Sequence, residues 1–213
     1  MKTALLIDGG HLRAACKRAD VQYNNDLIVD FANRCFAENE HIYRIFYYDA
    51  RPFSGKLRTP VSGTDVEYQN RSMWLDTLAT KKRFAVRLGR VAFRGWKLKR
   101  EKHENLPKKD LTDNHFRPAF EQKGVDMRIG LDIANLASRG RIDRILLVSG
   151  DSDMEPALKE GRIAGLEVVV ILITGTNLHP HKSLLAHSDE IREVPLSTAL
   201  VASDPVTTAE ERT

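Results

Sequence analysis

Ile145-Leu146-Leu147-Val148-Ser149-Gly150-Asp151-Ser152-Asp153 is the stretch that decides the fold. Its four consecutive apolar residues predict a short strand that is buried on both faces, as is typical of a parallel sheet. A turn follows at once and carries two acidic side chains. In an open α/β sheet, ligands bind outside the carboxyl ends of the strands. Asp151 and Asp153 are therefore predicted to lie where a ligand binds.

The same pattern occurs at the start of the chain. The apolar run 4–7 is followed by Asp8 and Gly9-Gly10, which predicts a buried strand over residues 3–7 that ends at the glycines. If the two strands are parallel, Asp8 and Asp151 project from the same edge of the sheet. A third segment, Lys123-Gly124-Val125-Asp126, brings another acid to the start of a predicted helix.

Strand and helix patterns alternate along the chain and predict a three-layer α/β/α fold with a mostly parallel central sheet. The expected strands cover residues 3–7, 41–49, 145–148, 166–173 and 191–194, with an extended stretch at 84–98. The expected helices cover residues 26–38, capped by Asp26, and 66–80, 125–138, 154–164 and 183–187. Residues 51–64 contain prolines and glycines and predict a loop.

The length of 213 residues favours one domain, which we place at residues 1–196. Within it, residues 81–120 form a basic insertion that is extended or loop-like, and residues 101–117 are expected to be a mobile connection. The polar residues 197–213 predict a disordered tail. Two cysteines outside any metal-binding spacing suit a reducing compartment. Apolar runs too short for a signal peptide or a bilayer span predict a soluble, cytoplasmic protein without a membrane partner.

Positive charge is concentrated in one segment. Twelve Lys or Arg residues and only two acids lie between Lys81 and Lys109, whereas the whole chain has a net charge of +4. A segregated basic segment is the electrostatic pattern expected of a protein that binds a phosphate backbone. The competing interpretation is a solvated loop that keeps the protein soluble, because charge alone identifies a partner weakly.

Each acid also has a simpler explanation when it is taken alone. Asp8 could form an Asx-turn, and Asp126 and Asp153 could each cap a helix. Taken together, three segments bring carboxylates to one edge, and like charges at short range raise one another's pKa unless a cation lies between them. Mg²⁺ and Mn²⁺ are hard cations that prefer such oxygen ligands, and they can activate water for phosphodiester hydrolysis. Asp132 is secondary because it lies about 240° around the helix from Asp126.

The combined motifs resemble the NYN domain family of the PIN-like nuclease superfamily, and its LabA-like branch is the nearest match. The resemblance covers residues 1–194, and segments 165–170 and 183–189 fit the later part of the family pattern. It implies an α/β/α fold and RNA cleavage at an acidic site that binds Mg²⁺ or Mn²⁺. The matching catalytic and metal positions are Asp8, Asp126, Asp151 and Asp153, with Asp132 as a further acidic position.

The resemblance also suggests residues that contact the substrate. Ser149 lies in the motif and is expected to hold the turn or to bond a ligand, and Lys123 is close enough in sequence to contact a phosphate. The family often has Asn where this chain has His11, a side chain that can still donate to a phosphate or to a metal-bound water. From the basic segment, the candidates for backbone contacts are Arg87, Arg90, Arg94 and Lys97.

The leading hypothesis is a metal-dependent endoribonuclease that acts on single-stranded RNA. Few aromatic residues lie in the basic segment, which predicts modest sequence specificity. The alternative is a non-catalytic RNA-binding or regulatory module with the same fold. Action on DNA or on small nucleotides also stays open, because recognition of the 2′-hydroxyl depends on local geometry. A homo-oligomer is compatible with the sequence, although no pairing surface can be identified in it.

Overall fold

The computed structural model describes residues 1–69, 71–99 and 111–197. These residues form a three-layer α/β/α fold, as the sequence predicts. Of the connection expected to be mobile at 101–117, residues 101–110 lie outside the described residues, whereas residues 113–117 form a 3-10 helix and the start of a strand, contrary to the expectation. The expected disordered tail, apart from residue 197, also lies outside the described residues. Within the described ranges, no helix is long and apolar enough to cross a membrane.

The middle layer of the described fold is a seven-stranded sheet with the order β6-β5-β2-β1-β7-β8-β9. All neighbouring pairs are parallel except β5 with β6. The strands are β1 (Lys2–Asp8), β2 (His41–Ala50), β5 (Phe84–Leu98), β6 (Phe116–Lys123), β7 (Arg144–Val148), β8 (Glu167–Thr174) and β9 (Glu190–Pro195). Because β2, β1 and β7 are adjacent and parallel, their carboxyl ends meet at one edge, which we call the carboxyl edge.

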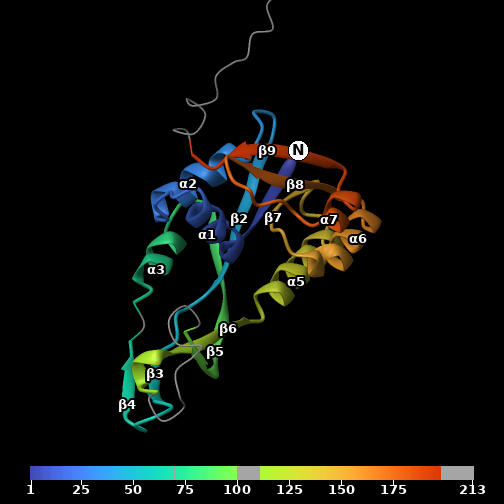
Figure 1. Cartoon of the computed structure of the whole chain (residues 1–213). Coiled ribbons are helices and arrows are strands. Elements are labelled where there is room, and N and C mark those ends of the chain that lie inside the picture. Colours follow the sequence, from blue (N-terminus) through green and yellow to red (C-terminus); the bar gives the residue numbers. More distant parts are fainter. Residues whose placement is uncertain (70, 100–110, 198–213) are drawn as a thin grey trace, which may run out of the picture.

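Helices cover both faces of this sheet (Figure 1). One face is covered by α1 (Gly9–Arg18), α2 (Asn25–Arg34) and α3 (Met73–Ala79). The other face is covered by α5 (Val125–Ser138), α6 (Glu155–Ile163) and α7 (Lys182–Ala186). Two short 3-10 helices, η2 (Asp113–His115) and η3 (Ser152–Met154), precede β6 and α6.

Alternate residues of the central strands enter two different hydrophobic cores. In β1, Leu5 and Ile7 pack with the α1–α3 layer, whereas Ala4 and Leu6 pack with α5 and α6, and all four are fully buried. Burial on both faces requires the unbroken apolar runs that predict these strands. Each fully buried Leu or Ile contributes roughly 1.5–3 kcal/mol, so the two cores fix the positions of the strand ends.

The sequence-based prediction misses α1, which begins at the glycines expected to end the first strand. Asp8 caps this helix, because its carboxylate accepts hydrogen bonds from the amides of Gly10 and His11. Gly9 allows close packing here: a Cβ at this position would lie 2.4 Å from Tyr47 Oη. The glycine pair therefore marks a tight approach of α1 to β2 rather than the end of regular structure.

Four other features differ from the prediction. The N-cap of α2 is Asn24, whose side chain accepts from the amide of Leu27, and not Asp26. The expected loop 51–64 contains β3 (Gly55–Arg58), and the expected helix 66–80 is instead β4 (Asp65–Tyr68) followed by α3. β6 was not predicted, because its residues lack the period-2 apolar pattern of a half-buried strand.

An arm extends from the carboxyl-edge side of the sheet, beyond the helical layers (Figure 1). We define the arm as residues 53–68, which include β3 and β4, together with residues 90–99 and β6. β5 pairs with β2 up to Gly89 and also with β6 from Arg90 onward, which carries the hairpin past the core. The arm has its own small aromatic cluster, with ring centroids 5.2–6.1 Å apart, formed by Phe53, Tyr68, Phe93, Trp96 and Phe120.

Candidate active site at the carboxyl edge

Asp8 ends β1 at the centre of the carboxyl edge. Its Oδ1 accepts from Gly10 N at 2.8 Å and from His11 N at 3.3 Å. Burial raises the pKa of Asp8, the two amide hydrogen bonds lower it, and the charge of Asp126 raises it again, so that the net pKa lies above its ordinary value. A nearby cation would therefore stabilise the ionised form of Asp8.

Ser149 joins Asp8 to the loop that follows β7. This side chain is fully buried, and its Oγ lies 3.4 Å from Asp8 Oδ2 and 3.2 Å from the amide of Asp151. Asp151 in turn accepts from the amide of Asp153 at 3.0 Å and caps η3. The expectation that Ser149 holds the turn agrees with these bonds. They fix the Ser-Gly-Asp-Ser-Asp loop relative to the end of β1.

Asp126 approaches the same edge from α5. The N-cap of this helix is Gly124, so the capping role considered for Asp126 is wrong. Although the residue reaches solvent, partial burial and then the charges of Asp151 and Asp153 raise its pKa. The capping role considered for Asp153 is also wrong, since α6 begins after Met154 without a side-chain cap. Asp126 therefore interacts electrostatically with acids from two other segments. These acids are Asp8 at the end of β1, and Asp151 and Asp153 after β7.

The described residues contain no group of three or more His, Cys, Asp or Glu side chains arranged to hold a metal ion. The donors nevertheless suit Mg²⁺ or Mn²⁺, because they are all carboxylate oxygens. Mg²⁺ is usually bound by one or two carboxylates and completes its shell with water and phosphate oxygens. Burial first, and then the charges of neighbouring carboxylates, raise the pKa of Asp8 and of Asp126, and a bound divalent cation would oppose both effects.

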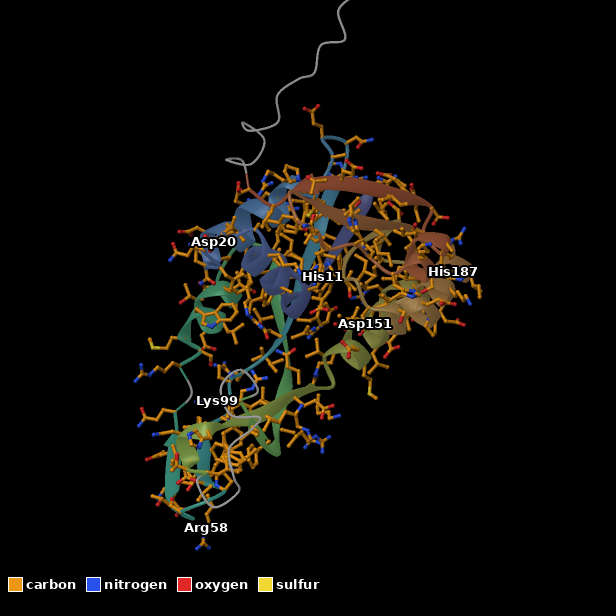
Figure 2. The ribbon with its side chains drawn as sticks, viewed as in Figure 1. His11, Asp20, Arg58, Lys99, Asp151 and His187 are labelled. Atoms are coloured by element: carbon orange, nitrogen blue, oxygen red, sulfur yellow. The ribbon has the colours of Figure 1, made fainter. Side chains whose placement is uncertain are left out.

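His11 lies beside this acidic group, in the first turn of α1. A Cβ on Gly150 would lie 2.7 Å from His11 Cε1, so the imidazole packs directly on the glycine backbone. Burial, and then the charge of Arg18, lower the pKa of His11 to about 4. The ring is therefore neutral near pH 7. Figure 2 places His11 and Asp151 in the middle of the molecule, above the arm that carries Lys99 and Arg58.

Asp49 is an acid of this edge that the sequence reasoning missed. Because Asp8 pairs with Tyr48 across β1 and β2, Asp49 lies one residue beyond that pair. It is buried, forms an ion pair with Arg13, and accepts from Tyr47 Oη at 3.2 Å and Gln122 Nε2 at 3.0 Å. These partners satisfy its carboxylate, so its role is to position Arg13 and Gln122. The available signal was its place at the end of a predicted strand.

Asp132 is engaged by side chains outside the acidic group. Its Oδ2 accepts from Tyr48 Oη at 2.9 Å and from Arg87 Nε at 3.1 Å. The Arg87 guanidinium also lies 5.4 Å from the centre of the Phe46 ring. Asp132 therefore ties α5 to β2 and β5. Arg87, a candidate for substrate contact, is already engaged in that connection.

The arm presents a basic face. A register shift between Phe93 and Trp96 inserts one extra residue, so both rings lie on one side and Arg90, Arg94 and Lys97 on the other. Arg117 pairs with Lys97 across the hairpin, and Lys123 pairs with Arg90. Glu121, the acid of this face, bonds Arg94 and Lys123. Within the described residues, Arg90, Lys97 and Arg117 make no ion pair.

Two hollows are associated with the sheet. One of about 810 Å³ lies by α6 and β8, is lined by Arg162, Ile163 and Asp189 among others, and includes none of the acids above. A second, of about 520 Å³, is lined by Arg13, Tyr23, Asn24, Asn25, Asp26 and Trp74. Arg13 connects this second hollow to Asp49 and so to the carboxyl edge.

The α/β/α fold carries these acids at the carboxyl edge, where open α/β sheets bind their ligands. The chain belongs to the NYN domain family, whose model matches residues 2–194. This result confirms the family predicted from the sequence motifs, while the LabA-like branch stays a prediction. The family suggests nuclease activity.

The fold is also similar to a solved structure, that of a protein of unknown function from Vibrio parahaemolyticus RIMD 2210633. The TM-score is 0.52 at 15% sequence identity, with 90% of this chain and 91% of that chain covered. At this identity the likeness supports the fold alone. No curated protein matches this chain.

Proposed function

We propose that this chain is a cytoplasmic, divalent-metal-dependent endoribonuclease that hydrolyses single-stranded RNA at the carboxyl edge. The observation that carries the proposal is the electrostatic coupling of Asp8, Asp126, Asp151 and Asp153, which come from three separate segments. An edge evolved only for helix capping has no need for charges that raise the pKa of Asp8 and of Asp126. A metal-assisted phosphodiesterase needs such a site and little else from the protein.

In this proposal, Asp8 and Asp126 are the first candidates to hold Mg²⁺ or Mn²⁺, with Asp151 and Asp153 beside them. The bound ion would supply charge neutralisation at the phosphate and a lower pKa for an attacking water. Ser149 fixes the distance between β1 and the Asp151 loop through its two hydrogen bonds. His11 is neutral and packs on the Gly150 backbone, so its role is to shape the site rather than to carry charge.

The basic face of the arm is proposed to bind the RNA backbone. Arg90, Lys97 and Arg117, which form no ion pair with any described residue, can each neutralise a phosphate, whereas Arg94 and Lys123 share Glu121. Phosphate contacts of this kind give affinity without sequence information. The aromatic residues of the hairpin pack against β3 and β4 instead of facing this surface, which is consistent with modest sequence specificity.

Cleavage of a fluorescent single-stranded RNA with Mn²⁺ or Mg²⁺ tests the proposal. Asp151→Asn is expected to reduce the rate about 100-fold or more, because several kcal/mol of transition-state stabilisation are lost. Asp65→Asn is the matched control, since Asp65 is an exposed acid on β4 outside the acidic group. Equal rates for Asp151→Asn and the unaltered chain contradict the catalytic assignment. A DNA strand of the same sequence tests selectivity for ribose.

A non-catalytic RNA-binding module is the competing function. It is favoured by one observation: His11 stands where the family often has Asn, and it is half-buried, neutral and packed on Gly150. RNA binding that depends on the arm, without metal-dependent cleavage of any RNA strand tested, supports this module over the nuclease.

A further inference from the structure

The hollow of about 520 Å³ between α1, α2 and α3 has the features of a binding pocket for a flat aromatic ligand. Its size falls in the range of small-molecule sites. Tyr23 and Trp74 meet edge to face with centroids 5.8 Å apart, and both side chains remain partly exposed. Tyr47 contacts both rings. Its ring centroid lies 6.1 Å from that of Trp74, and its hydroxyl shares a hydrogen bond with the Tyr23 hydroxyl.

One buried polar atom in the wall lacks a partner. Asn25 Nδ2 donates to the carbonyl of Trp74 at 3.0 Å, and that carbonyl requires a donor, so the orientation of the amide is fixed. Asn25 Oδ1 is then left buried, with no hydrogen-bond partner within the described residues. A buried unsatisfied acceptor costs about 1–3 kcal/mol. Because Asn25 lines the hollow, a small rotation of its side chain would bring Oδ1 to an N–H donor of a bound ligand and remove that cost.

The pocket is next to the proposed active site. Arg13 lines it, lies 5.3 Å from the centre of the Tyr23 ring and pairs with Asp49. Asp49 also holds Gln122, whose Oε1 lies 3.7 Å from the position of a Cβ on Gly10, next to Asp8. Along α1, Asp8 and Arg13 are separated by about 7.5 Å of helix rise. A nucleotide chain with its phosphate near Asp8 can therefore place a neighbouring base in this pocket.

We propose that this pocket is a nucleobase subsite that selects an amino-bearing base in the RNA, through ring contact with Tyr23 and Trp74 and an N–H bond to Asn25. The inference rests on the proposed function for its RNA substrate. It adds a base preference that the basic arm cannot supply. Base stacking on aromatic side chains contributes about 1–3 kcal/mol per base. The amide acceptor discriminates among bases by their hydrogen-bond donors.

Calorimetry on the unaltered full chain with adenosine 5′-monophosphate tests the pocket without any cleavage step. We expect a Kd of about 1 mM or tighter, roughly fivefold weaker binding of purine riboside 5′-monophosphate, which lacks the amino group, and no binding of ribose 5-phosphate. In Trp96→Phe, Trp74 is the remaining tryptophan, so its fluorescence should change on addition of adenosine 5′-monophosphate. Asn25→Ala should remove the difference in affinity between adenosine 5′-monophosphate and purine riboside 5′-monophosphate. Asn33→Ala, at an exposed position of α2, should retain that difference.

Equal affinities for adenosine 5′-monophosphate and ribose 5-phosphate overturn the subsite, as does an unchanged Trp74 signal. The comparison of nucleotides on the unaltered chain holds even if a variant fails to fold. RNA cleavage without adenosine 5′-monophosphate binding overturns the subsite alone and leaves the nuclease intact. Nucleotide binding by a chain that cleaves no RNA supports the subsite and contradicts the nuclease.

Discussion

Ser149 Oγ lies 3.4 Å from Asp8 Oδ2 and links the loop after β7 to the end of β1. Ser149→Ala removes this bond and also the acceptor for the Asp151 amide. We expect a loss of about 2 kcal/mol in the free energy of unfolding, because both partners are left under-satisfied. Urea denaturation measures it, and RNA cleavage should fall as the loop loosens. Ser138→Ala, at the exposed end of α5, is the control, and an equal effect there contradicts the linking role.

Neutralising the basic face of the arm should weaken RNA binding and flatten its salt dependence. For single strands, log affinity falls with log salt by about 0.7 per phosphate neutralised. The triple variant Arg90→Gln, Lys97→Gln and Arg117→Gln should therefore lower the slope by about 2. Fluorescence anisotropy with EDTA present measures binding without cleavage. Lys2, Arg139 and Arg141, exposed at the opposite edge, form the control triple, and a matching change there removes the arm from the RNA site.

Asp132 is expected to stabilise the fold without serving the metal site. Asp132→Asn weakens the bonds from Tyr48 Oη and Arg87 Nε, and should cost about 1.5–3 kcal/mol as charged hydrogen bonds are replaced. The Mn²⁺ concentration required for half-maximal cleavage should stay unchanged. In Asp126→Asn the same concentration should rise. A similar rise in both variants assigns Asp132 to the metal site and corrects this account.

Glu40 lies at the opposite edge of the sheet, and its ionisation should make the free energy of unfolding depend on pH. Its buried side chain pairs with Arg144 and Arg192. Burial alone raises the pKa of Glu40, but the hydrogen bonds from Arg192, Ala37 and Arg144 outweigh it and hold the pKa below its ordinary value of 4.5. A depressed pKa gives stability that is complete above pH 4.5 and is lost as the pH falls through the folded pKa.

Glu40→Gln is therefore expected to cost about 2 kcal/mol at pH 7, since the half-buried Arg144 and Arg192 lose the carboxylate that they share and retain only Glu167 and Glu190. The difference in the free energy of unfolding between this variant and the unaltered chain should shrink as the pH falls below 4.5. Thermal unfolding across pH 3 to 8 measures it, with Glu38→Gln, an exposed neighbour, as control. A difference that stays constant with pH contradicts the role of the Glu40 charge.

The parts of the fold that sequence could predict are those with strong local patterns. β1, β7 and β8 are unbroken apolar runs, and α5 carries a helical apolar period from Val125 to Ser138. The parallel arrangement then brings Asp8 and Asp151 to one edge. Helix geometry alone separates Asp132 from Asp126, in agreement with its partners Tyr48 and Arg87.

The parts that sequence could not predict depend on contacts distant in the chain. α1 begins at two glycines because Gly9 packs against Tyr47, and nothing local distinguishes that from a turn. β6 is held by pairing with β5, and its own pattern is weak. Asp49 was missed for the same reason, because its partners Arg13 and Gln122 lie on these two elements.

Anomalous diffraction from a crystal of the chain soaked in Mn²⁺ tests the central claim most directly. The account predicts a peak at the carboxyl edge, about 2.1 Å from carboxylate oxygens of at least two of Asp8, Asp126, Asp151 and Asp153, by analogy with Mg²⁺. The peak should disappear in Asp126→Asn and persist in Asp65→Asn. A carboxyl edge without a peak at saturating Mn²⁺, or a peak bound only by other residues, contradicts the account.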